Sequence, residues 1–257
     1  PQTLIDLMFG NQAINQITPK STLNDDKIPK ILLDISNFHE KAENKPPYNE
    51  STITIPPKTI VGVAGLQGSG ADKFIQNFQY NPNMITEPSQ ESPRQDLHIT
   101  YVPSDRLEKG LFPDMTICEH IALAYNHRNT VNWSEMEKLS ESLIIKYGIV
   151  GTPNSVAQNL SGGNQQRLML SLVSESTELL LLEQPTRGLD IQSANYVWEN
   201  LSSTKETKIL TIFSSTDLDE IYDYSEYIIC FFNNSIVAYG YPKDLPRNIT
   251  MQKISGN

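Results

Sequence analysis

Apolar residues recur along the chain in runs of strand length, and these runs predict a sheet. The strand-length runs lie at 30–38, 51–57, 59–65, 98–103, 178–185, 208–215 and within 227–240. The runs "TIVGVAG" (59–65) and "ELLLLEQP" (178–185) are nearly uninterrupted, as is typical of parallel strands that are buried on both faces. The last run, "YIICFFNNSIVAYG", has a turn signal at Asn233-Asn234 and predicts a hairpin.

Helical patterns fill the spaces between these runs. Amphipathic stretches at 116–128, 134–149, 190–203 and 217–225 predict helices. Ser134 and Glu137 have the spacing of a capping box for the second of them. The segment 81–97 carries three prolines and is expected to be a solvent loop. The fold class predicted is therefore α/β, a largely parallel sheet interrupted by a helical insertion.

A glycine-rich stretch, "GLQGSGAD" (65–72), lies between the strand predicted at 59–65 and an amphipathic segment. Its glycines have the spacing of the phosphate loop G-x-x-x-x-G-K-[ST]. However, Ala71 replaces the lysine and Asp72 replaces the magnesium-binding hydroxyl residue. The candidate nucleotide-binding positions are Gly65, Gly68, Ser69, Gly70, Ala71 and Asp72.

These replacements predict weak phosphate binding. Loss of a charge-assisted lysine contact costs about 1.5–3 kcal/mol, or roughly 10- to 150-fold in affinity. The Asp72 carboxylate at the start of a helix would repel the phosphate, although it stabilises an empty helix end by about 0.3–1 kcal/mol.

A second motif, "LSGGNQQR" (160–167), precedes a helix and is followed by "LLLLEQPTRGLD" (179–190). This ordered set resembles the ATP-binding-cassette (ABC) family from about residue 30 onward. Together with "VPSDRLEKGLF" and "SSTDLDEI", it is most similar to the second cassette of tandem-cassette ATP-binding proteins. Those proteins energise bacterial importers of simple sugars, of the galactoside or ribose type, or of nucleosides. The implied signature residues are Leu160, Ser161, Gly162, Gly163, Asn164 and Gln165.

The resemblance implies an ABC ATPase core that has an antiparallel β part and a helical subdomain at about 105–165. The stretch "LIDLMFG" is similar to the end of a first cassette, so residues 1–28 are expected to be a linker from an upstream cassette and 29–257 the second cassette. In such a pair, the signature loop faces the γ-phosphate of ATP held by the opposite cassette. Ser161 to Gly163 would offer a hydroxyl and backbone N–H donors at a helix N-terminus.

The catalytic positions that the resemblance identifies have been replaced in this chain. Walker B normally ends in Asp-Glu, whereas here the pair is Glu183-Gln184. Glu183 can still accept a hydrogen bond from metal-bound water, but the Gln184 amide cannot act as a base. The switch position, usually histidine, is Thr216, and the Q-loop position, usually glutamine, is Ser104. The D-loop positions are Gly188, Leu189 and Asp190.

The family binds ATP with Mg²⁺, and this chain is expected to bind both weakly or not at all in its own site. Phe38, His39 and Tyr48 are the candidates for stacking on adenine. The expected partners are the upstream cassette, membrane permease subunits and, indirectly, a substrate-binding protein. The expected location is peripheral, on the cytoplasmic face of the bacterial inner membrane.

Composition narrows the function classes further. The net charge of −10 argues against a nucleic-acid partner, because phosphate neutralisation requires clustered Lys and Arg. The two cysteines, Cys118 and Cys230, each lie among apolar residues and are expected to be buried thiols. Neither they nor the four histidines have metal-ligand spacing, so no metal site is assigned.

The segment from Ser104 to about Ala124 corresponds to the family's surface for the permease's coupling helix. Leu111, Phe112, Met115 and Ile117 could dock there, and subdomain core explains them about as well.

Two other functions remain open at the level of sequence. One is a self-sufficient soluble ABC ATPase, which the missing lysine, glutamate and histidine oppose. The other is a structural or regulatory cassette that has lost nucleotide altogether. The intact signature beside a replaced Walker pair favours the composite-site interpretation over both.

Overall fold

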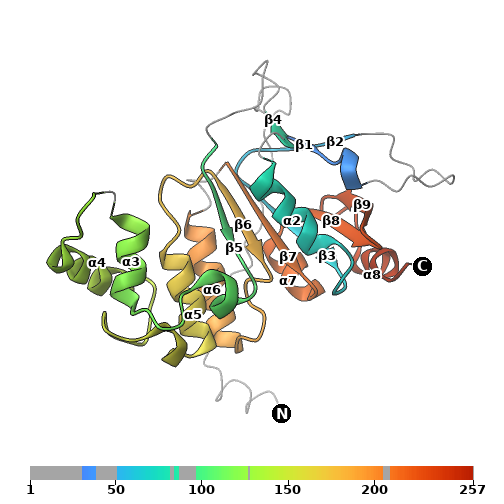
Figure 1. The fold of residues 1–257 in the computed structure, drawn as a ribbon. Helices are drawn as coiled ribbons and strands as arrows, with labels where there is room; N and C mark the ends of the chain where they lie inside the picture. The colour runs from blue at the N-terminus through green and yellow to red at the C-terminus, as the bar shows by residue number, and fades with distance from the viewer. Residues whose placement is uncertain are drawn as a thin grey trace, which may run out of the picture.

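The computed structural model describes residues 31–38, 51–81, 84–86, 97–126, 128–204 and 209–256. Within this part of the chain, a six-stranded sheet has the strand order β5-β6-β7-β3-β8-β9 (Figure 1). All pairs in it are parallel except β8 with β9. The strands are β3 (Thr59–Gly65), β5 (Ile99–Val102), β6 (Leu179–Glu183), β7 (Leu210–Ser215), β8 (Tyr227–Phe232) and β9 (Ser235–Gly240).

A second, smaller sheet is antiparallel and has the order β2-β1-β4. Its strands are β1 (Ile31–Asp34), β2 (Thr52–Ile55) and β4 (Ile85–Thr86). Strand β1 ends earlier than the apolar run 30–38 predicts, because the Asp34 carboxylate accepts a hydrogen bond from Ser36 N (2.9 Å) and turns the chain.

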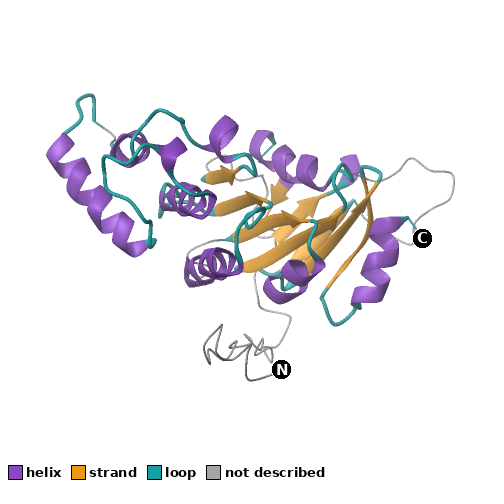
Figure 2. Ribbon diagram, turned by 90° about the horizontal axis from the view of Figure 1, so that it is seen from below, coloured by secondary structure: helices purple, strands orange, loops and turns teal. Residues whose placement is uncertain are grey.

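Helices cover both faces of the large sheet (Figure 2). Alternate residues of β3 show how the two cores divide. Ile60 and Ala64 pack in a core that is shared with α5, α6 and α7, whereas Val61 and Val63 pack in a core with α2 and the small sheet. Burial on both faces explains why β3 reads as a continuous apolar run. The helices are α2 (Ala71–Tyr80), α3 (Ile117–Tyr125), α4 (Trp133–Lys146), α5 (Gly162–Ser171), α6 (Ile191–Thr204), α7 (Leu218–Tyr224) and α8 (Arg247–Ser255).

The predicted fold class is confirmed, and the helical insertion is visible as α3 and α4, which lie to one side of the sheet (Figure 1). Two short helical segments complete this region, η3 (Arg106–Gly110) and η4 (Ala157–Asn159). The predicted hairpin also forms. Asn233 and Asn234 both have left-handed backbones, with φ of 49° and 61°, as a two-residue hairpin turn requires.

Two local predictions need correction. The capping box predicted at Ser134 and Glu137 is wrong, because α4 begins one residue earlier and Asn132 caps it by accepting from Glu135 N. A capping box does form at α3, between Thr116 and Glu119. The segment 81–97 is not wholly a solvent loop, since Ile85 in β4 is buried against β1.

The C-terminal helix α8 was not predicted. Its residues buried deepest are Thr250 and Ile254, one turn apart, so the apolar stripe is too sparse to give a periodic signal.

Candidate functional site

The glycine-rich loop between β3 and α2 is held against the hairpin turn. Gly68 and Gly70 have φ of 83° and 102°, in the left-handed region that favours glycine. A Cβ on Gly70 would lie 2.7 Å from Asn234 Cα, and Asn234 N donates a hydrogen bond to Ser69 O (2.6 Å). Ser69 itself is buried. The glycines therefore serve close packing of this chain as well as a phosphate-loop conformation.

Asp72 lies in the first turn of α2 and is hydrogen-bonded to the ends of two strands. Its carboxylate accepts from Ser214 Oγ (2.7 Å) at the end of β7 and from Gln184 Nε2 (3.2 Å) just after β6. Gln184 N in turn donates to Ser214 O (3.1 Å). Because a carboxylate only accepts, the Gln184 amide nitrogen must face Asp72. The two replaced motif positions, 72 and 184, thus bind each other.

Glu183, the Walker B acidic position, has a different partner. It is buried at the end of β6 and accepts a hydrogen bond from the Tyr101 hydroxyl of β5. Gln76 Nε2 of α2 donates to the same hydroxyl oxygen (3.4 Å). Burial, and secondly the hydrogen bond to Glu183, raise the pKa of Tyr101 well above its usual value. The phenol therefore stays protonated and remains a donor to Glu183 at neutral pH.

The predicted signature segment forms the start of α5. Ser161 is the N-cap of α5, and its Oγ accepts from Asn164 N (3.4 Å) and Asn164 Nδ2 (2.9 Å). Asn164 Oδ1 also accepts from Val150 N (2.8 Å), which ties the first turn of α5 to the segment that follows α4. Gln165 donates to the carbonyls of Ala157 and Leu160 and is buried. The first turn of α5 contains no acidic residue.

The first turn of α6, just after the predicted D-loop, packs directly on the signature helix α5. A Cβ on Gly163 would lie 2.6 Å from Ser193 Oγ and 3.1 Å from Ser193 Cβ, so a larger residue would have to displace the Ser193 side chain. Ser193 is itself held by Asp190, whose carboxylate accepts from Ser193 N (3.0 Å) and Ser193 Oγ (2.8 Å). The first of these bonds, followed by the second, lowers the pKa of Asp190. Asp190 therefore starts α6 and positions the contact with α5.

One short segment connects the end of β6 with the start of α6. It begins at Gln184, where φ is 45°, turns through Gly188, where φ is 69°, and ends at Asp190. Arg187 N donates to Gln184 O (3.1 Å), and Leu189 N donates to Thr186 O (3.0 Å). Gln184, the partner of Asp72, and Asp190, which holds Ser193 against the signature helix, thus lie at opposite ends of seven consecutive residues.

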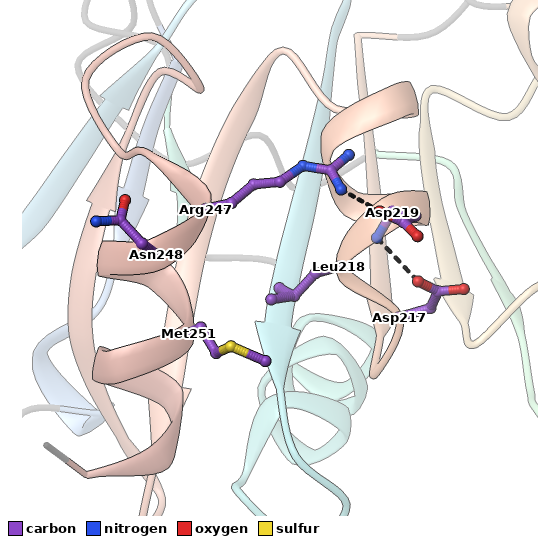
Figure 3. A pocket seen from close by; sticks show the side chains of 6 residues that line it. All are labelled: Asp217, Leu218, Asp219, Arg247, Asn248 and Met251. Atoms are coloured by element: carbon purple, nitrogen blue, oxygen red, sulfur yellow. Dashed lines mark hydrogen bonds and ion pairs between the residues drawn. The ribbon is translucent and has the colours of Figure 1, made fainter.

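Ser104 and Thr216, the predicted Q-loop and switch positions, each follow a strand of the large sheet. Ser104 follows β5 and is half-buried, whereas Thr216 follows β7 and is exposed. Beside Thr216 in the sequence, a cleft of about 330 Å³ lies between the starts of α7 and α8 (Figure 3). It is lined by Asp217, Leu218, Asp219, Arg247, Asn248 and Met251. Arg247 forms ion pairs with Asp219 and, at 3.7 Å, with Asp223, so its charge is already compensated.

Of the candidates for stacking on adenine, Phe38 packs within the protein. Its ring lies edge-on to Phe74, with centroids 5.0 Å apart, and to Phe231 at 5.9 Å. His39 and Tyr48 lie outside the described residues.

Among the four apolar residues considered for docking, only Phe112 is well exposed, at 59% of its surface. Leu111 and Ile117 are core residues, and Met115 is half-buried.

A family comparison identifies the chain. A sequence model described as "ABC transporter" matches residues 48–187, which is more than half of the chain. The chain belongs to the ABC transporter family. The match includes the glycine-rich loop, the predicted signature segment and the predicted Walker B strand.

Relatives in this family carry importer names. The chain is 26% identical to a nucleoside import ATP-binding protein of Lactococcus lactis, over 91% of this chain and 49% of the relative. It is 28% identical to a ribose import ATP-binding protein of Clostridium tetani, over 88% of this chain and 46% of the relative. The chain thus spans about half the length of these relatives.

A solved structure supports the ABC fold. A dimeric ATP-binding cassette in a post-hydrolysis state with ADP and phosphate matches with a TM-score of 0.59 at 18% identity, over 82% of this chain and 98% of that one. In the described part of this chain, no helix is both long enough and apolar enough to cross a membrane.

Sequence reasoning identified positions 72, 183 and 184 one at a time and missed that side chains of this protein satisfy them. A signal was present for one pair, since an acid at 72 and an amide at 184 are complementary. Tyr101, which donates to Glu183, and Arg106, which donates to Gln166 of α5, gave no such signal.

Proposed function

We propose that this chain is the second cassette of a tandem ATP-binding protein in a bacterial importer of simple sugars, of the galactoside or ribose type, or of nucleosides. Its signature segment completes an ATP site whose phosphate loop belongs to the other cassette. Its own Walker site does not hydrolyse ATP and binds nucleotide weakly or not at all.

The observation that carries this proposal is the pairing of Asp72 with Ser214 and Gln184. In a working site, position 72 would supply a hydroxyl to Mg²⁺ and position 184 a carboxylate to water. Here the carboxylate stands on the phosphate-loop side, both its oxygens have donors, and Ala71 offers no cation. These residues do not fit a magnesium triphosphate, because adding its negative charge beside Asp72 would require breaking the pair without a cationic replacement.

The signature side has the opposite character. The first turn of α5 begins at Gly162 and carries no acidic residue, and the Ser161 side chain is exposed at its start. Helix N-terminal N–H groups and a hydroxyl are suitable donors for a phosphate presented by another cassette. When bound there, the triphosphate supplies the scissile bond. The part of this chain is to hold donors in place and to pack the D-loop behind them.

The names of the relatives support the importer class, and the half-length match supports a tandem protein. The resulting partners are the other cassette, permease subunits and, through them, a substrate-binding protein. The location that follows is the cytoplasmic face of the membrane.

The experiment compares two exposed positions in the assembled tandem protein. Ser161→Arg fills the space in front of α5 and should lower ATPase activity and transport by about 100- to 1,000-fold, as removal of positioned donors typically does. Thr216→Ala alters the switch position of this chain's own site and should change both rates less than about twofold.

Melting curves of both variants control for folding, since Ser161→Arg also removes an N-cap worth about 1 kcal/mol. A loss with Thr216→Ala as large as with Ser161→Arg, in equally stable proteins, would mean that this site hydrolyses ATP. No loss with either variant would favour a purely structural cassette.

A further inference from the structure

We propose that Arg106 is a positioning residue, which fixes the signature helix and the D-loop relative to each other. Its meaning for ATP hydrolysis rests on the function proposed above, but the positioning itself can be measured on this chain alone. Arg106 begins η3, two residues after the Q-loop position Ser104.

The Arg106 guanidinium contacts both elements at once. Its Nε donates to Gln166 Oε1 of α5 (3.0 Å), and its Nη2 donates to the carbonyl of Arg187, the residue just before the D-loop. Its Nη1 would be 3.3 Å from a Cβ on Gly162, the first residue of α5. A planar fork with five donors can satisfy two acceptors in different directions, which a lysine ammonium on a flexible stem cannot reproduce with the same geometry.

The state of Gln166 shows that this contact determines its orientation. Gln166 is 2% exposed, and its Nε2 is one of two buried side-chain nitrogens without a hydrogen-bond partner among the described residues. Because arginine has only donors, the glutamine oxygen must face it, and the amide nitrogen is left unsatisfied. A buried amide rarely remains in such a state. The Arg106 contact therefore sets the side-chain orientation of Gln166.

The segment that carries Arg106 is attached to α5 at its other end as well. A Cβ on Gly110 would lie 2.2 Å from Met169 Sδ, so the last residue of η3 packs directly on α5. At its start, Asp105 caps η3 by accepting from Glu108 N (3.0 Å). The segment 106–110 is thus held along the side of the signature helix, and a displacement after β5 would move α5 and the D-loop together.

Amide hydrogen exchange on the purified chain tests the positioning. Arg106→Gln should speed exchange at Gln165 N, in the first turn of α5, and at Leu189 N, in the D-loop, by about tenfold or more, the factor for losing charge-assisted hydrogen bonds. Lys109→Ala removes an exposed cation from the same segment and serves as the matched control, with no change expected at these amides.

Two further variants separate positioning from general loosening. Arg106→Lys keeps the charge but not the fork, and should not restore wild-type exchange. Gln166→Met removes the acceptor, and its effect combined with Arg106→Gln should be smaller than the sum of the two, because they remove the same contact. Unchanged exchange at both amides in Arg106→Gln would overturn the inference, as would full rescue by lysine.

ATPase assays on the tandem protein distinguish this inference from the proposed function. The proposed function predicts that Ser161→Arg lowers activity by about 100- to 1,000-fold. The positioning role adds that Arg106→Gln lowers kcat at least tenfold with little change in the KM for ATP. If Ser161→Arg inactivates and Arg106→Gln does not, the positioning role is refuted and the proposed function stands. If neither variant affects activity but exchange rises in Arg106→Gln, the positioning role stands and the composite-site function is refuted.

Discussion

Replacing Gln184 by glutamate tests the Asp72–Gln184 pair most severely, because it adds a carboxylate where an amide now donates. Gln184 Nε2 lies 3.2 Å from Asp72 Oδ2. The variant loses a hydrogen bond to a charged group, worth about 1.5–3 kcal/mol. Two like charges about 4 Å apart also repel by about 4 kcal/mol at an effective dielectric constant of 20. One carboxyl of the new pair can relieve this repulsion by holding a proton, so the total cost at pH 7 should be about 2–5 kcal/mol.

The pH dependence has a definite sign. The proton shared by the new pair is bound more tightly in the folded state, so the variant is least destabilised below about pH 4, where the unfolded chain is also protonated. The difference from wild type should grow as the pH rises toward 7. Urea unfolding at pH 4.5 and pH 7.5 measures this difference for both proteins.

The control variant exchanges the two groups. Asp72→Asn combined with Gln184→Glu restores one amide facing one carboxylate and should recover most of the lost stability at pH 7.5. If Gln184→Glu alone is as stable as wild type at pH 7.5, or if the double variant is no better than the single one, the two side chains do not form the pair described here.

Two other predictions concern packing and protonation. Gly70→Ala should lower the free energy of unfolding by about 2–5 kcal/mol, because its Cβ would meet Asn234 Cα at 2.7 Å in a left-handed backbone. Gly68→Ala has open space around its Cβ and should cost only about 1–2 kcal/mol. Urea unfolding measures both costs, and equal costs would contradict the packing of Gly70 on Asn234. Burial lowers the pKa of His120, and its Nε2 accepts from Phe112 N. The free energy of unfolding should therefore fall as the pH drops below about 6.5, where the unfolded imidazole takes up a proton, and His120→Gln should reduce this dependence; parallel profiles would refute it.

The sheet could be predicted from sequence because its central strands are buried on both faces and therefore consist of continuous apolar runs. The residues directly before and after Val61 in β3 and Leu181 in β6 are not polar, so the apolar run is unbroken there. The small strand β4 was missed because two residues cannot show a period, and α8 because few of its residues are buried.

The motif residues could be found one by one, but their partners could not. Asp72 meets Ser214 across 142 positions of sequence, and Tyr101 meets Glu183 across 82. Such contacts depend on the order of strands in the sheet, where β5 lies beside β6 and β6 beside β7. Sequence spacing alone carries no information about that order.

Titration of the purified chain with Mg²⁺–ATP in a calorimeter measures whether this chain's own site binds nucleotide. If Asp72 and Gln184 close this site, no saturable binding should be seen below about 1 mM. Binding is weak because the lysine contact is missing at Ala71 and because the Asp72 carboxylate repels the phosphate. Ala71→Lys combined with Asp72→Ser should tighten binding by an order of magnitude or more. A dissociation constant in the low micromolar range for the wild-type chain would mean that Asp72 and Gln184 do not close this site.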